Sequence, residues 1–202
     1  MSLRILPFRQ YDENDVINLF ALESASVNES TTAFGSGDAG VFVKVSAGDF
    51  DLDPVAYGDD AYLGKTDYPH VKAQYPSVSL KCAPAEAGDS LLGITLRQTA
   101  KTDENGEKLL YNPVKAEELG CVMPGQAVPV ATRGVFTINA AAFEGALTVG
   151  QGITLSATAG KVETCPPADP TKVGTVIGTG TRTSGNITDA LEGAYAVIAL
   201  GL

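Results

Sequence analysis

Short apolar runs, separated by glycine, proline and small polar residues, cover most of the chain after residue 76. Each run has the length of a β-strand rather than of a helix. The expected strands are 77–81, 91–98, 108–111, 127–131, 134–138, 152–156, 161–164, 174–177 and 195–200. Short strands at this spacing predict a mainly β fold, a small β-barrel or β-sandwich with short connector helices.

The joints between these runs carry local signals. Asn105-Gly106 suits the positive φ angles of a tight hairpin turn, so a hairpin is expected to join 94–98 to 108–111. Residues 112–120 predict a two-turn helix, with Asn112 as N-cap, Pro113 at the first helical position and Gly120 just past the end. A single turn is expected at 139–143, and Gly178 and Gly180 indicate a bulge or turn.

The first 75 residues differ from the rest. In 15–22 the apolar positions fit both a helix and an extended chain, and we favour an extended N-terminal arm. A polar, small-residue loop follows over 24–40, and 41–45 restores a strand. The expected organisation is therefore an arm and loop over 1–40, a tyrosine- and aspartate-rich region over 41–75, and a core β domain over 76–202.

Composition and charge exclude several classes of function. The 202 residues carry 24 acidic and 14 basic side chains, a net charge of −10 that opposes binding to nucleic acid. A hydrophobic share of 44% is too high for a disordered chain, and no apolar run reaches the length of a membrane span. No secretory signal is visible at the start, so assembly in a cytosol is expected.

Catalytic groups are scarce in the sequence. His70 is the one histidine, in a polar stretch that indicates a surface loop, so a triad built on imidazole would depend on it alone. Cys82, Cys121 and Cys165 are widely spaced and indicate small buried apolar side chains or inert surface thiols rather than a zinc site or a disulfide framework. No glycine-rich segment matches a phosphate-binding loop. We therefore expect no enzyme activity and no cofactor.

Two groups of side chains remain as candidates. Asp49, Asp51 and Asp53 alternate and are weak candidates for a calcium site, although alternation also places them on the wet face of a strand. Tyr57, Tyr62 and Tyr68 lie in a short stretch with Tyr75, and tyrosines are common at interfaces. They predict either a contact surface or a cover for the domain's own core.

Two pieces of the chain resemble known phage proteins. The segment PFRQYDENDVINLFAL at 7–22 resembles the opening of virion structural proteins of tailed phages. PGQAVPVATRGVF at 124–136, VGQGITL at 149–155 and GKV at 160–162 are similar to the small β-rich decoration, or cement, proteins of phage capsids.

The resemblance implies a non-enzymatic virion protein that binds the outer capsid surface and bridges neighbouring major capsid subunits. It implies the major capsid protein as partner, self-association into a homotrimer or homodimer, and assembly in the host cytoplasm. The expected anchors are Phe8, Tyr11, Ile17, Leu19 and Phe20, with Tyr57, Tyr62 and Tyr68 as a second patch. A tail or head-fibre component, a glycan-binding adhesion module, or a small metal-dependent hydrolase or lyase using aspartates remain alternatives.

Overall fold

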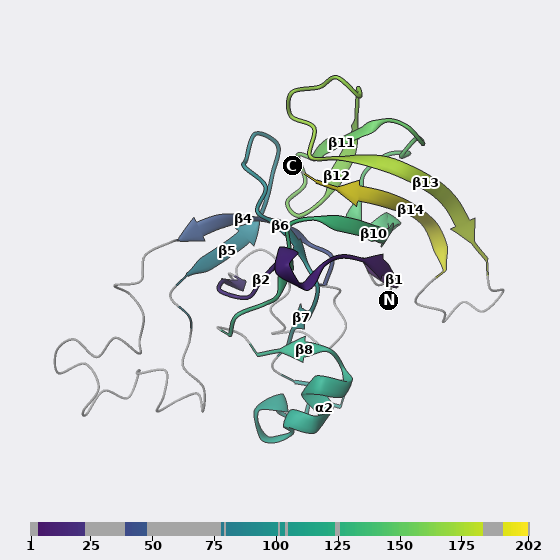
Figure 1. The fold of residues 1–202 in the computed structure, drawn as a ribbon. Helices are drawn as coiled ribbons and strands as arrows, with labels where there is room; N and C mark the ends of the chain where they lie inside the picture. Colours follow the sequence, from purple (N-terminus) through teal and green to yellow (C-terminus); the bar gives the residue numbers. More distant parts are fainter. Residues whose placement is uncertain are drawn as a thin grey trace.

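The computed structural model describes residues 4–22, 39–47, 78, 80–100, 102–103, 105–123, 126–183 and 192–201. These residues form two six-stranded sheets and a small appended module (Figure 1). The mainly β prediction is confirmed. Of its two alternatives the sandwich fits, and the described strands form no closed barrel.

Sheet A joins the N-terminal strand to the second half of the chain. Its order is β1 (Ile5–Gln10), β10 (Gly134–Asn139), β14 (Gly193–Leu200), β13 (Gly174–Arg182), β11 (Gly152–Leu155) and β12 (Val162–Cys165), with every neighbouring pair antiparallel. A register shift between Val176 and Gly178 confirms the bulge expected in β13.

Sheet B has the order β2 (Val16–Ile17), β9 (Val130–Ala131), β6 (Gly93–Thr95), β4 (Phe42–Ala47), β5 (Lys81–Pro84) and β3 (Ala21–Leu22). Its two edge strands, β2 and β3, are close neighbours in the sequence, and Ala21 forms an isolated bridge with Ala127. The sheet is therefore curled, with its edges drawn toward each other.

The main core lies between the two sheets. Phe42 and Ile94 from sheet B and Phe136, Ile138 and Ile198 from sheet A are fully buried in one cluster. Sheet B also buries its other face, because Val43, next to Phe42, belongs to a second cluster with Val41, Leu22, Cys82, Val128 and Val130. This double burial explains the continuous apolar run Val41-Phe42-Val43 at the start of β4.

The N-terminal segment is extended, as predicted, but it does not project from the domain as an arm. β1 pairs with β10, β2 pairs with β9 and β3 pairs with β5, with a short 3-10 turn η1 (Glu13–Asp15) between β1 and β2. Gly134 permits the close approach of β1: it has a φ of +138°, and a Cβ there would lie 2.7 Å from the carbonyl oxygen of Gln10. The divisions expected at residues 40 and 75 thus do not divide the sheets.

The appended module is inserted in the chain between β6 and β9 of sheet B. It contains the parallel pair β7 (Gln98–Thr99) and β8 (Cys121–Val122), the 3-10 helix η3 (Leu109–Tyr111) and α2 (Pro113–Glu118). The helix and its boundaries agree with the prediction, and Gly120 has the expected positive φ of 63°. A further 3-10 turn, η4 (Ala140–Ala142), confirms the turn expected at 139–143.

The prediction of a strand at 108–111 is wrong, because residues 109–111 form a 3-10 helix. The turn at Asn105-Gly106 forms, with a φ of 84° at Gly106, but only Thr102 and Lys108 make a β-bridge across it. The chain then enters η3, because Leu109 is buried with Ala100 and Cys121 in a small core of the module. Tertiary packing decides the conformation of this short apolar run over its strand propensity.

Candidate functional site

Two of the five predicted N-terminal anchors are strongly exposed. Phe8 on β1 exposes 67% of its surface, and Leu19, between β2 and β3, exposes 54%. Because β1 belongs to sheet A and β2 and β3 to sheet B, one short stretch of chain presents an apolar side chain at each sheet. Residues that come before and after each position in the chain are paired with a neighbouring strand, which fixes the backbone at Phe8 and at Leu19.

The other three anchors contribute to the domain itself. The ring of Tyr11 stacks on Phe136, with 5.9 Å between the ring centroids, and is partly exposed. Ile17 is half-buried in β2, and Phe20 packs against the second core cluster of sheet B. The second predicted patch, Tyr57, Tyr62 and Tyr68, and the metal candidates Asp49, Asp51 and Asp53 lie outside the described residues, as does His70.

A hollow of about 410 Å³ lies on sheet A beside Phe8. We call it the sheet-A hollow. It crosses four neighbouring strands, β1, β10, β14 and β13. Its lining consists of Leu6, Pro7, Phe8, Thr137, Tyr195, Val197, Thr181 and Arg182.

The strand alternation places this hollow on the side of sheet A that faces away from the core. In β14, Ala196 and Ile198 belong to the main core, so Tyr195 and Val197 point to the opposite side. Thr137 is paired with Val197 and lies on the same side, between the core residues Phe136 and Ile138. The hollow is therefore a surface feature of the sandwich and not an internal cavity.

The absence of a side chain at Gly180 leaves room for the ring of Tyr195. The two residues are opposite each other in the β13–β14 pair. A Cβ on Gly180 would lie 2.5 Å from Oη and 2.6 Å from Cζ of Tyr195, so the ring lies directly across the glycine backbone. One wall of the hollow thus depends on a missing side chain.

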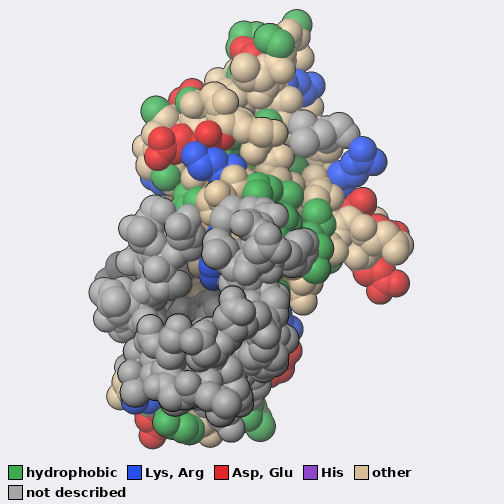
Figure 2. Space-filling view, turned by 90° about the vertical axis from the view of Figure 1, so that its left-hand side faces the viewer, with side chains coloured by type: hydrophobic (Ala, Val, Ile, Leu, Met, Phe, Trp, Pro, Cys, Tyr) green, Lys and Arg blue, Asp and Glu red, His purple; other side chains and the backbone are tan. Residues whose placement is uncertain are grey.

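The charge of these four strands is opposite to that of the whole chain. β1, β10, β13 and β14 contain Arg9 and Arg182 and no aspartate, glutamate or lysine. The chain as a whole has 24 acidic and 14 basic residues. The acidic residue Glu192 stands in the sequence directly before β14. Elsewhere acidic and basic groups are mixed, as on the face drawn in Figure 2.

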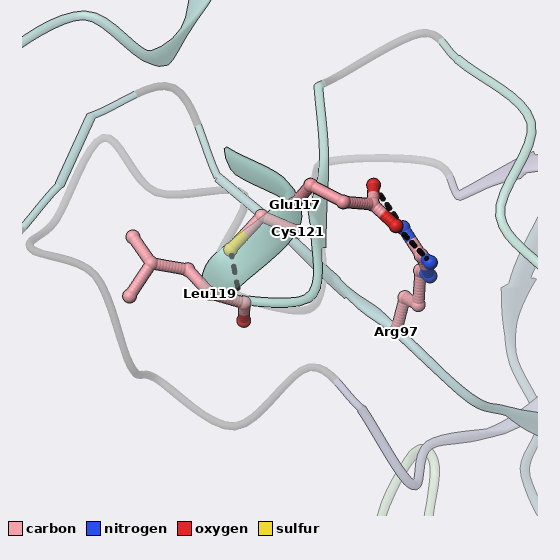
Figure 3. Close-up of polar contacts among 4 residues, drawn as sticks. All are labelled: Arg97, Glu117, Leu119 and Cys121. Carbon is pink, nitrogen blue, oxygen red and sulfur yellow. Dashed lines mark hydrogen bonds and ion pairs between the residues drawn. The ribbon is translucent and has the colours of Figure 1, made fainter. Parts of the chain in front are cut away.

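A second hollow, at the junction of the sheets with the module, has compensated charge. Its lining consists of Arg9, Tyr11, Glu13, Val16, Leu96, Arg97 and Pro129. Arg97 donates from Nη1 and Nη2 to the two carboxylate oxygens of Glu117 at 2.8 and 2.6 Å (Figure 3). This pair raises the pKa of Arg97 and lowers the pKa of Glu117, so the guanidinium is already matched by a carboxylate. It ties α2 to the segment after β6.

A buried ion pair fixes the module internally. The side chain of Asp103 is fully buried and accepts from Lys115 Nζ and from the backbone N–H groups of Asn105 and Glu107 at 2.9 and 2.7 Å. The hydrogen bond from Lys115 is the main reason that the pKa of Asp103 lies below its usual range. With every carboxylate oxygen bonded, the role of Asp103 is to hold the turn and the helix together.

The remaining polar clusters also have structural roles. Glu144 accepts from Ser156 Oγ at 2.5 Å and from Thr158 Oγ1, which lowers the pKa of the carboxyl group. Ser156 is fully buried, so its hydroxyl cannot reach a substrate. Cys82, Cys121 and Cys165 are free and buried, which is one of the two alternatives predicted for them, and burial raises the pKa of Cys165. The described ranges bring together no set of three metal-ligating side chains.

The sequence interpretation missed the residues of the sheet-A hollow other than Phe8. A signal for them exists in β14, Gly193–Leu200, which reads GAYAVIAL and is apolar at positions of both faces. An antiparallel strand with one wet face normally alternates apolar and polar residues. An apolar outer face on such a strand indicates a surface that another molecule covers.

Comparisons with known proteins give no relative: no family model, no curated protein and no solved structure matches the chain. Within the described residues, no helix combines the length and the apolar character needed to cross a bilayer.

Proposed function

We propose that this chain is a non-enzymatic structural protein of a phage virion, which binds the outer surface of the capsid and bridges neighbouring major capsid subunits. The observation that carries the proposal is the exposure of Phe8 on a fixed strand beside the sheet-A hollow. A phenylalanine held in water in this way gains about 2 kcal/mol when a partner buries it. Aromatic residues at the centre of a contact are the usual anchors of protein interfaces.

The two exposed anchors support the bridging part of the proposal. Phe8 lies on sheet A and Leu19 beside sheet B, so two separate contacts can reach two different subunits. The N-terminal segment is paired into both sheets. A force that a capsid subunit exerts on Phe8 or Leu19 is therefore transmitted to the whole sandwich. Self-association into a trimer or dimer belongs to the same proposal, since several linked copies hold a shell more strongly than one.

The test uses empty shells assembled from the major capsid protein encoded in the same genome. Shells are mixed with the purified chain and sedimented, and the bound chain is quantified against the shell protein. We expect saturable binding in many copies per shell, and weaker binding of Phe8→Ser. The matched control is Tyr111→Ser, which removes an exposed aromatic residue from the appended module. Absence of binding by the unaltered chain would overturn the proposal.

Point substitutions are the right tool for this test. Removal of residues 1–22 would delete β1, β2 and β3, and with them an edge of sheet A and both edges of sheet B. Loss of binding after such a deletion would report unfolding rather than the loss of a contact.

A further inference from the structure

The long strand β13 is paired along only part of one of its sides. On one side it pairs with β14 over its whole length, and on the other side β11 pairs with Gly174 and Thr175. The backbone of Val176 still bonds to the turn before β11. Beyond it, residues 177–181 have no partner strand on this side within the described part of the chain. We call this stretch the open edge of β13 (Figure 1).

The other edges of the two six-stranded sheets are protected. β1 carries Pro7, which lacks a backbone N–H. β12 is covered by the segment before β11, where the backbone N–H of Glu144 donates to the carbonyl of Val162 at 2.8 Å. β2 and β3 are each two residues long. Strand edges attract further strands and are normally protected in these ways, so the open edge of β13 is an exception that a partner strand accounts for.

The hydrogen-bond pattern identifies the backbone groups that point outward from β13. The N–H of Asn139 donates to the chain just before β1, so Asn139 and its β14 partner Tyr195 exchange no hydrogen bonds with each other. The backbone groups of Tyr195 therefore point toward β13, to Gly180 opposite. Because this direction alternates along a strand, the N–H and C=O groups of Thr179 and Thr181 point to the open edge.

The side chains along the open edge are uncharged and accessible. Ile177 is 51% exposed, and Thr179 and Thr181 are exposed as well. β13 and β14 contain no aspartate or glutamate, and Glu192 precedes β14, which lies on the opposite side of β13 from this edge. Two copies of a chain of net charge −10 can therefore meet along the open edge without placing carboxylates of the paired strands opposite each other.

We propose that two copies of the chain pair antiparallel through the open edge of β13, about a two-fold axis at Gly180. A strand that pairs with its own copy needs no other partner sequence. Thr179 of each copy lies opposite Thr181 of the other, and these pairs exchange about four backbone hydrogen bonds. A two-fold axis at Thr179 would instead bring the end of the partner strand to Val176, whose backbone already bonds to the turn before β11.

The packing of Tyr195 on Gly180 supports this register. The hydroxyl end of the ring lies over Gly180, so the ring reaches from β14 toward the open edge. At a two-fold axis through Gly180 the rings of both copies come together on one face of the continuous sheet, and aromatic side chains at the centre of a contact are typical of protein interfaces.

The dimer has a consequence for the orientation of the sheet-A hollow. A two-fold axis perpendicular to the sheet turns the hollows of both copies to the same side. Both Phe8 side chains can then contact one shell, a step that rests on the proposed function. The pairing itself does not depend on capsid binding, and it selects the dimer from the two assemblies that the proposed function leaves open.

The test measures the mass of the full chain in solution by sedimentation equilibrium. We expect a monomer–dimer equilibrium with a dissociation constant on the order of 0.1 mM. Thr179→Lys with Thr181→Lys places lysines opposite lysines across the axis and is expected to weaken the dimer roughly tenfold or more. Thr179→Glu with Thr181→Lys places opposite charges together in this register and is expected to dimerise at least as tightly as the unaltered chain. The matched control is Tyr111→Lys with Val114→Lys, which adds the same charge at exposed residues of the appended module.

Three results would overturn the inference. The first is an unaltered chain that stays monomeric at about 1 mM or forms a trimer. The second is a dimer that the two lysines at the open edge leave unchanged. The third is a dimer that the glutamate and lysine pair weakens as much as the two lysines do, which would contradict the register about Gly180.

Failure of the inference and failure of capsid binding are distinguishable. If the chain dimerises as described but shells do not bind the unaltered chain, the proposed function fails and the inference stands. If shells bind the unaltered chain and no dimer forms through the open edge, the inference fails and capsid binding stands.

Discussion

The hydroxyl end of the ring of Tyr195 lies over Gly180, with Oη only 2.5 Å from the position that a Cβ at residue 180 would take. The two residues are partners in the longest strand pair of the structure, β13 and β14. A glycine in the middle of a strand normally weakens it, so its presence here needs a local reason. That reason is the tyrosine ring, which forms a wall of the sheet-A hollow.

Gly180→Ala is therefore expected to displace the ring of Tyr195 and to destabilise the fold by about 1–3 kcal/mol. Gly178→Ala is the matched control on the same strand, because its Cβ would lie 3.8 Å from Val197, an ordinary contact. Urea unfolding measures the free energies, and the NMR signals of the tyrosine ring report its position. Equal effects of the two substitutions would show that the ring does not occupy the place described.

The assignment of the two faces of β14 gives a second prediction. Ile198→Ala opens a cavity in the main core and is expected to lower the free energy of unfolding by about 3–4 kcal/mol. Val197→Ala, on the neighbouring residue but on the side of the sheet-A hollow, is expected to cost about 1 kcal/mol or less. Chemical denaturation of both variants measures the difference. A larger cost for Val197→Ala would reverse the assignment of the faces.

The buried pair of Asp103 and Lys115 gives a prediction about pH. Because the pKa of Asp103 is lowered in the folded protein, its contribution is present above the unfolded pKa, about 3.9, and is lost as pH falls further. A double-mutant cycle with Asp103→Asn and Lys115→Met is expected to show a clear coupling free energy at pH 7 and a smaller one at pH 2. Thermal unfolding at both pH values measures it, and an unchanged coupling would contradict the assignment.

The bridging role predicts that one substitution can preserve binding of the chain to capsid shells while it removes the stabilisation of the shells against heat. If Phe8 and Leu19 contact different subunits, Leu19→Ser leaves the chain attached through Phe8 but removes the bridge. The unaltered chain is expected to raise the temperature at which capsid shells disrupt, and Leu19→Ser is expected to bind while raising it much less. Light scattering on heating measures disruption. Full stabilisation by a bound Leu19→Ser variant would contradict bridging through this residue.

Local chemistry explains which elements the sequence predicts well. Proline at the first position and glycine past the end mark α2, and the one-turn element after Asn139 follows from its capping side chain, which accepts from the N–H of Ala140. Alternating and continuous apolar runs locate the strands of sheet A, since the main core is formed from them. Such signals act over a few residues and need no knowledge of the partner strands.

The remaining features depend on contacts between distant residues. The run at 108–111 has strand character, yet it becomes 3-10 because Leu109 packs on Ala100 and Cys121. The pairing of β1 with β10 joins residues far apart in the chain, so the composition of 5–10 alone does not distinguish a projecting arm from an edge strand. The sheet-A hollow has the same origin, because four strands from three parts of the chain contribute its lining.

The most direct measurement of the proposed function is a difference image of virions with and without this protein, recorded by electron cryomicroscopy. Attachment to the outer capsid surface predicts extra density spread over the head, between neighbouring capsid subunits, with sheet A against the shell. Heads that are identical in the two images, or extra density confined to the tail or to a single vertex, would contradict it.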